Sequence, residues 1–159
     1  MNTLVGRAIL TDMRKGPVLC AVDFSRASLA ALSEAIWFAR SEARPLVLVH
    51  VLPPPIPPDS VGYVPVRMYE EMESAVRQHA AKREEKLAAA AGRKGVRCRA
   101  LLVKGVPHEE IVRAARLNHA GLIVIGTHGR TGLAKLLMGS VAARVVGTAP
   151  CPVLTVRGK

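Results

Sequence analysis

The segment GTHGRTGLAKLLMGS, at 126–140, has the residue types that could hold a phosphate group. It directly follows the apolar run GLIVI. Binding a phosphate chain requires backbone amides, close approach without side chains and, best of all, the positive end of a helix. Gly126 ends the apolar run, Gly129 lets the chain turn, and Gly139 with Ser140 opens the next helix with free amides and a hydroxyl. This spacing predicts an anion-binding loop.

The residues between the glycines add positive charge to this predicted loop. Nine residues separate Gly129 from Gly139, enough for the chain to fold over a bound group and return, at roughly 3.3 Å per extended residue. Arg130 lies in this stretch together with Lys135, and either could neutralise phosphate charge. His128 could contact phosphate too, although a solvated loop histidine is the ordinary case.

Two better-known phosphate motifs are absent. No GxGxxG follows the first apolar run, and no GxxxxGK is followed by Ser or Thr. A single glycine at the end of a strand is structural more often than functional. The joint placement of these glycines, beyond one strand and before one helix, favours a binding function.

Apolar runs alternate with helical patterns along the chain and predict an α/β fold. The runs lack polar alternation, as in buried parallel strands. Such alternation indicates an open parallel sheet with helices on both faces, and ligands bind beyond the carboxyl ends of its strands. The expected strands are 17–22, 46–51, 96–103, 121–126 and 151–157, and the expected helices are 25–43, 67–91, 107–117 and 140–148.

Helical spacing of apolar residues predicts the buried face of each helix. Because aromatic residues make up only 3% of the chain, Val, Leu, Ile and Ala must form the core. The expected buried positions are Leu29, Leu32, Ile36 and Ala39 in the first helix, Met68, Met72, Val76, Ala80 and Leu87 in the second, and Ile111, Ala114, Ala115 and Leu117 in the third.

Composition narrows the functional classes. The net charge of +11 is spread along the chain, and only five aromatic residues are available for stacking on bases, so nucleic-acid binding is disfavoured. No run approaches the roughly 18 apolar residues of a membrane span, and the N-terminus makes a poor export signal, so a cytoplasmic location without membrane association is expected. We expect an N-terminal extension at 1–16 and a single domain at 17–159. Cys20, Cys98 and Cys151 have no zinc-ligand spacing and are interpreted as small buried residues.

The glycine pattern resembles a known family signature. Gly126-x2-Gly129-x9-Gly139-Ser140 is similar to the nucleotide-binding motif of the universal stress protein family, and VAARVVGTAPCPVLTVR, AVDFS and LVHV resemble other segments of that family. The resemblance runs from about Pro17 to Arg157. It implies a Rossmann-like fold, of the adenine nucleotide alpha hydrolase-like type, with strand order 3-2-1-4-5.

The resemblance also implies roles for particular residues. Asp23 would bind the ribose hydroxyls, although it could instead only cap the helix beginning near Ser25. Val51 would contact adenine through its main chain, and His50 is interpreted as a core residue. The remaining implied nucleotide-binding residues are Ala21 and Val22 beside the base, Ile125 near the phosphates, and Gly126, Gly129, Arg130, Gly139, Ser140 and Val141 around the phosphates.

The expected function is a regulatory, ATP-binding stress-response protein. The ligand would be ATP, with or without Mg²⁺, and no residues are assigned as metal ligands. In the family the last strand supports dimers, so we expect a homodimer through 151–157. Two alternatives remain: slow ATP hydrolysis, although the loop lacks the lysine and acid pairing of vigorous ATPases, and a basic interaction module that binds a nucleic acid or a protein partner without nucleotide.

Overall fold

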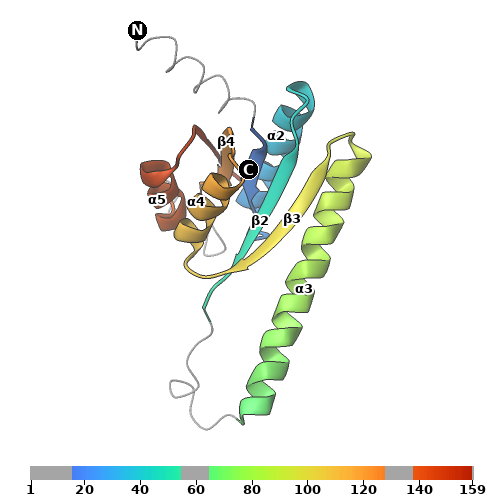
Figure 1. Cartoon of the computed structure of the whole chain (residues 1–159), viewed down its shortest axis with the longest axis vertical. Coiled ribbons are helices and arrows are strands. Elements are labelled where there is room, and N and C mark those ends of the chain that lie inside the picture. The colour runs from blue at the N-terminus through green and yellow to red at the C-terminus, as the bar shows by residue number, and fades with distance from the viewer. Residues whose placement is uncertain (1–15, 55–64, 128–137, 159) are drawn as a thin grey trace.

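The computed structural model describes residues 16–54, 65–127 and 138–158, and these residues form a parallel α/β sheet (Figure 1). The elements are β1 (Val18–Ala21), α2 (Arg26–Ser41), β2 (Leu46–Leu52), α3 (Val66–Arg93), β3 (Cys98–Lys104), α4 (Pro107–Leu117), β4 (Leu122–Gly126), α5 (Ser140–Thr148) and β5 (Val153–Val156). The five strands are parallel in the order β3-β2-β1-β4-β5, as predicted.

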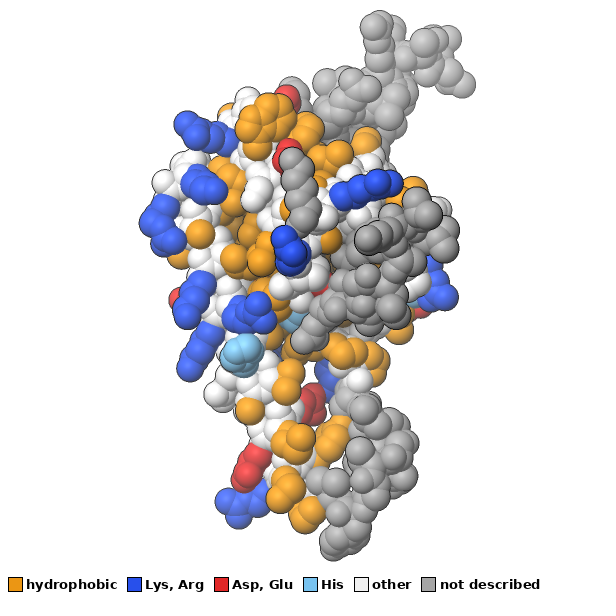
Figure 2. Space-filling model, turned by 180° about the vertical axis from the view of Figure 1, so that it is seen from behind, with side chains coloured by type: hydrophobic (Ala, Val, Ile, Leu, Met, Phe, Trp, Pro, Cys, Tyr) orange, Lys and Arg blue, Asp and Glu red, His pale blue; other side chains and the backbone are white. Residues whose placement is uncertain are grey.

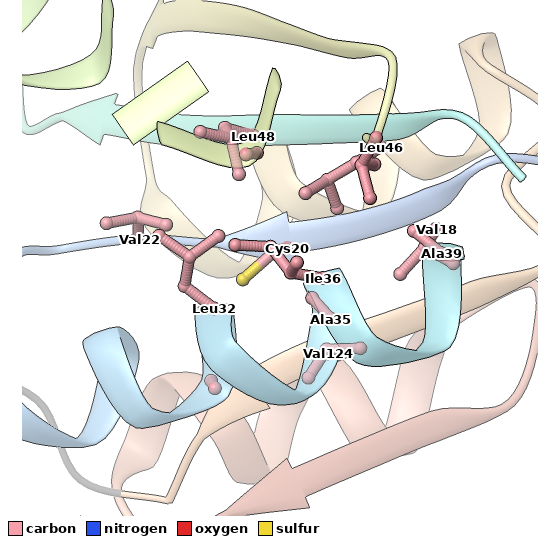
Figure 3. Close-up of a cluster of buried hydrophobic side chains, with 13 residues drawn as sticks. Val18, Cys20, Val22, Leu32, Ala35, Ile36, Ala39, Leu46, Leu48 and Val124 are labelled. Carbon is pink, nitrogen blue, oxygen red and sulfur yellow. The ribbon is translucent and has the colours of Figure 1, made fainter. Parts of the chain in front are cut away.

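Helices cover both faces of the sheet, and alternate residues of β1 point to the two faces. Val18 and Cys20 pack into the core under α2 and the C-terminal part of α3, drawn in Figure 3. Leu19 and Ala21 pack into the opposite core, under α4 and α5. Because β1 is buried on both faces, it contains an uninterrupted apolar run.

Local sequence signals set the helix ends. Ser25 caps α2 by accepting a hydrogen bond from the Ser28 amide (3.2 Å). Pro107 occupies the first turn of α4, where Glu109 complements the helix dipole. Gly95 follows α3 with a φ of +81°, a conformation that glycine adopts without strain.

Helix α3 extends far beyond the sheet. Its 28 residues span about 42 Å at 1.5 Å per residue, whereas the seven residues of β3 span about 23 Å. Figure 1 shows its N-terminal part projecting past the carboxyl ends of the strands. Exposed hydrophobic side chains lie on this projecting end in Figure 2.

The prediction of a buried apolar stripe on α3 is therefore wrong for the three residues at its N-terminal end. Met68, Met72 and Val76 are 53%, 62% and 58% exposed. Ala80 is the first buried residue of α3, so the close packing of this helix against the rest of the domain starts near this residue. The spacing of the apolar residues predicts that they share one face of the helix, but the sheet ends before it can cover the N-terminal part of that face.

Two other expected core positions are also wrong. Leu29 is 38% exposed, because the buried face of α2 is centred on Ser28, Ala31 and Ala35, one residue to the side. Leu117, the last residue of α4, is 70% exposed. Within the described ranges, the structure contains no helix with the length and apolar character that crossing a membrane requires.

Candidate functional site

A cleft of about 830 Å³ lies at the carboxyl ends of the central strands. This is the edge where ligands bind in open parallel sheets, beside the point where the strand order reverses. The cleft is lined by Ala21, Val22, Asp23, Val51, Ile125, Gly126, Gly139, Ser140 and Val141, which are nine of the predicted site residues. Gly129 and Arg130, like His128, lie outside the described residues.

Asp23 is the carboxylate of this cleft, and it is tied to the start of α2. Its Oδ1 accepts a hydrogen bond from the Ser25 amide (3.0 Å), and the Asp23 amide donates to Ser28 Oγ (3.3 Å). Burial alone would raise the pKa of Asp23, but the hydrogen bonds from Ser25 and Ser28 outweigh burial and lower the pKa below its ordinary value. The carboxylate is therefore ionised at neutral pH, while Ser25 is the residue that caps the helix.

Val51 offers its backbone groups to the cleft. Backbone groups of successive residues in a parallel strand point to opposite neighbours. Val49 O accepts from the Val22 amide (2.9 Å) and Leu52 O from the Gly105 amide (3.0 Å), so the N–H and C=O of Val51 point toward the β1 side. Pairing with β1 ends at Val49, and in the described part of the chain no hydrogen bond satisfies these two groups of Val51.

His50 explains why Val51 lacks a partner. Its Nδ1–H donates to the carbonyl oxygen of Val22 (2.6 Å), the group that a longer β1 would offer to the Val51 amide. His50 is itself buried. The prediction that it is a satisfied core residue is confirmed.

The N-terminus of α5 opens into the same cleft. Backbone pairing within the helix starts with the Ala143 amide, which donates to Gly139 O (3.0 Å), and no described side chain caps the helix. The amides of Ser140, Val141 and Ala142 thus remain available to an anion at the positive end of the helix dipole. The prediction that the Gly139 amide is free is wrong, because this amide donates a hydrogen bond to Thr127 O (2.7 Å).

Gly126 is needed for packing as well as for any ligand. A Cβ at this position would lie 2.8 Å from the carbonyl carbon of Ala27 and 2.9 Å from the Ser28 amide nitrogen. Backbone atoms in the first turn of α2 cannot move aside without a large cost in free energy. Strand β4 therefore passes the start of α2 at a distance that only glycine allows.

Sequence reasoning missed the wall of the cleft that α3 supplies. This wall consists of Ala75, Val76, His79, Ala80 and Arg83, and the side chains of Phe24 and Thr127 also line the cleft. The α3 residues stand more than 50 positions along the chain from Asp23, and no spacing rule connects them with it.

Reactive cysteine chemistry has no support at this site. Cys20 is fully buried, and burial raises its pKa far above the ordinary value. Burial, reinforced by Glu84, raises the pKa of Cys98 to about 11. Burial also raises the pKa of Cys151, so all three thiols stay protonated at neutral pH.

The sheet order, the cleft at its carboxyl edge and the uncapped α5 define a class of Rossmann-like α/β proteins with an anion-accepting cleft. The family model described as the universal stress protein family matches residues 16–157. The chain therefore belongs to the universal stress protein family, which confirms the resemblance found in the sequence.

Relatives and solved structures agree with this membership. The chain is 32% identical to universal stress protein YxiE of Bacillus subtilis over 144 residues, which cover 88% of this chain and 97% of that protein. It is 34% identical to universal stress protein MJ0531 of Methanocaldococcus jannaschii, over 88% of this chain and 81% of the relative.

The structure of the hypothetical protein MJ0577 superimposes with a TM-score of 0.79 and 29% identity, covering 92% of this chain and 98% of that one. A universal stress protein in complex with cAMP superimposes with a TM-score of 0.62 and 26% identity, covering 91% and 98%.

Proposed function

We propose that this protein binds an adenine nucleotide in the cleft at the carboxyl edge of its sheet and acts as a regulatory stress protein. The observation that carries the proposal is the arrangement along one cleft of three polar features that can still bond to a ligand. These are the backbone groups of Val51, the carboxylate of Asp23 and the amides at the start of α5.

Each feature matches one part of a nucleotide. The N–H and C=O of Val51 suit the donor and acceptor edge of adenine. The carboxylate of Asp23 suits a ribose hydroxyl, since its two oxygens can accept more hydrogen bonds than the one that Oδ1 accepts from the Ser25 amide. The α5 amides suit phosphate oxygens, which favour the N-terminus of a helix. The complex of a related universal stress protein with cAMP supports an adenine nucleotide as the class of ligand, and we propose ATP as the ligand, with or without Mg²⁺.

Calorimetry with ATP and with adenosine tests this assignment on the full chain. Ser140→Asp places a negative charge at the first residue of α5, where it suits the helix dipole but repels phosphate. We expect ATP affinity to fall roughly 10- to 100-fold, as for loss of charged hydrogen bonds, and adenosine affinity to stay within about twofold. Ala143→Asp, one turn further along and exposed, is the matched control. Absence of ATP binding to the unaltered protein at millimolar concentration would refute the proposal.

We further propose that the protein forms a homodimer through its C-terminal strand. β5 pairs with β4 on one side and is the last strand of the sheet, so its other edge can pair with a second copy. Val156 O accepts from the Thr127 amide and Pro152 O from the Ile123 amide, so Thr155 points its N–H to the open edge.

The variant Thr155→Pro removes this outward donor and spares the β4 ladder. Light scattering should give a dimeric mass for the unaltered protein and a monomeric mass for the variant. A monomeric mass for the unaltered protein at micromolar concentration would refute the dimer.

A further inference from the structure

The α3 wall of the cleft is not used by the contacts proposed above. The phosphate chain would run toward α5, which covers the opposite face of the sheet from α3 (Figure 1). His79 and Arg83 nevertheless line the cleft from α3, and Arg83 contacts the Phe24 ring. The cleft thus contains two α3 side chains that can donate hydrogen bonds and that the proposed adenine, ribose and 5′ phosphate contacts do not use.

Arg83 is held in place by an aromatic stack. Its Cζ lies 3.9 Å from the centroid of the Phe24 ring, and this ring contacts the His50 ring at a centroid distance of 4.6 Å. A guanidinium over an aromatic face keeps its planar set of N–H donors free at the rim. The side chain is therefore positioned before any ligand arrives.

The backbone of Phe24 is strained in the conformation that builds this stack. Its φ is +65°, in the left-handed region that bulky residues rarely adopt. Such strain costs of order 1–3 kcal/mol and is found preferentially at ligand sites. Phe24 directly follows Asp23 in the chain, and both residues line the cleft together with Arg83.

Arg83 makes no ion pair within the described residues. The ion pairs that involve α3 are Arg67 with Glu71 and Glu73 with Lys104. The next residue, Glu84, lies on the buried face of the helix, and burial raises its pKa to about 8, so it is mostly uncharged at neutral pH. A guanidinium that stacks on an aromatic ring and makes no ion pair is suited to bind an anion in the cleft.

We propose that Arg83, assisted by His79, binds a phosphate attached to the ribose of the adenine nucleotide, at its 2′ or 3′ oxygen. This inference rests on the proposed nucleotide function and specifies its ligand class. A 5′ phosphate chain is directed to α5 on the other face, whereas a phosphate on the ribose faces the α3 wall, where the positive charge of Arg83 opposes the repulsion from the ionised Asp23 carboxylate. The planar guanidinium suits this group, because arginine can donate two parallel hydrogen bonds to phosphate oxygens.

Calorimetry on the full chain tests the inference by comparing 5′-AMP with adenosine 2′,5′-bisphosphate and adenosine 3′,5′-bisphosphate. We expect one bisphosphate to bind roughly tenfold or more tightly than 5′-AMP, as for one charged hydrogen-bond pair. ADP carries its added phosphate on the 5′ chain and shows how much of the gain comes from charge alone. A bisphosphate advantage no larger than that of ADP would overturn the inference.

Variants of α3 separate specific contact from overall charge. In Arg83→Gln the affinity ratio of the preferred bisphosphate to 5′-AMP should fall close to one. His79→Asn should reduce this ratio by a smaller factor. Arg77→Gln removes the same charge from an exposed position of the same helix, away from the cleft, and should leave the ratio unchanged.

The affinity ratio of bisphosphate to 5′-AMP is measured within each variant, so a substitution that weakens the binding of both nucleotides equally leaves the ratio unchanged. Retention of the ratio in Arg83→Gln, or an equal loss in Arg77→Gln, would overturn the inference while the nucleotide function stands. Absence of binding of any adenine nucleotide to the unaltered protein would instead refute the proposed function, and with it this inference.

Discussion

Glu84 makes the stability of this domain depend on pH in a direction opposite to that of an ordinary salt-bridged acid. Its side chain is 2% exposed in the core contact of α3, and Oε1 has no hydrogen-bond partner among the described residues. Burial raises its pKa from 4.5 to about 8, and a backbone hydrogen bond from His50 only partly offsets burial. The folded protein therefore holds a proton that the unfolded chain releases.

The sign and size of the effect follow from this difference in bound protons. Between pH 4.5 and about 8 the unfolded state binds fewer protons at this residue than the folded state does, so the free energy of unfolding falls as pH rises. The fall is at most about 1.4 kcal/mol per pH unit for one proton, or roughly 2 to 3 kcal/mol between about pH 5.5 and 7.5. Above about pH 8 both states are ionised, and the contribution levels off.

Glu84→Gln keeps the size of the protonated side chain and cannot ionise. We expect its free energy of unfolding to approach that of the unaltered protein near pH 5 and to exceed it by a few kcal/mol near pH 8. Urea denaturation across this pH range measures the difference in free energy of unfolding between the two proteins. Both proteins contain the same histidines, so the contribution of histidine titration cancels in this difference. Glu85→Gln, at the neighbouring exposed position, should show no such trend. Parallel pH profiles for Glu84→Gln and the unaltered protein would refute a buried, protonated Glu84.

Two further substitutions test how α2 is positioned at the cleft. Gly126→Ala should lower the free energy of unfolding by roughly 1–3 kcal/mol, because the added Cβ would overlap the backbone of Ala27. Gly147→Ala is the control and should not destabilise the protein, because a Cβ there would have nothing within 4 Å. Urea denaturation measures both variants. Ser25→Ala should cost about 1 kcal/mol through loss of the α2 cap. An equal loss in Ser33→Ala, an exposed serine inside the same helix, would contradict the capping role; thermal unfolding measures both.

The sequence alone determined the element types and most of the cleft residues at the carboxyl ends of the strands, and the family resemblance implied the strand order. Strand β1 and helix α5 are recognisable locally, because an apolar run and a glycine-serine helix start depend only on neighbouring residues. Parallel strands bring their carboxyl ends to one edge, so the sequence pattern places Asp23, Val51 and Gly126 near one another. Nine predicted site residues line the cleft, and Gly129 with Arg130 stay predictions.

Only the tertiary structure decided which positions were covered and which polar groups stayed unpaired. Periodicity places Met72 and Ala80 on one helical face, but the end of the sheet leaves the first exposed and buries the second. The amide of Gly139 donates a hydrogen bond to Thr127, while the amides of Val51 and Ser140 have no hydrogen-bond acceptor among the described residues. This difference arises because hydrogen-bond partners come from other parts of the chain. Burial and pairing depend on contacts between distant segments, and local spacing does not contain that information.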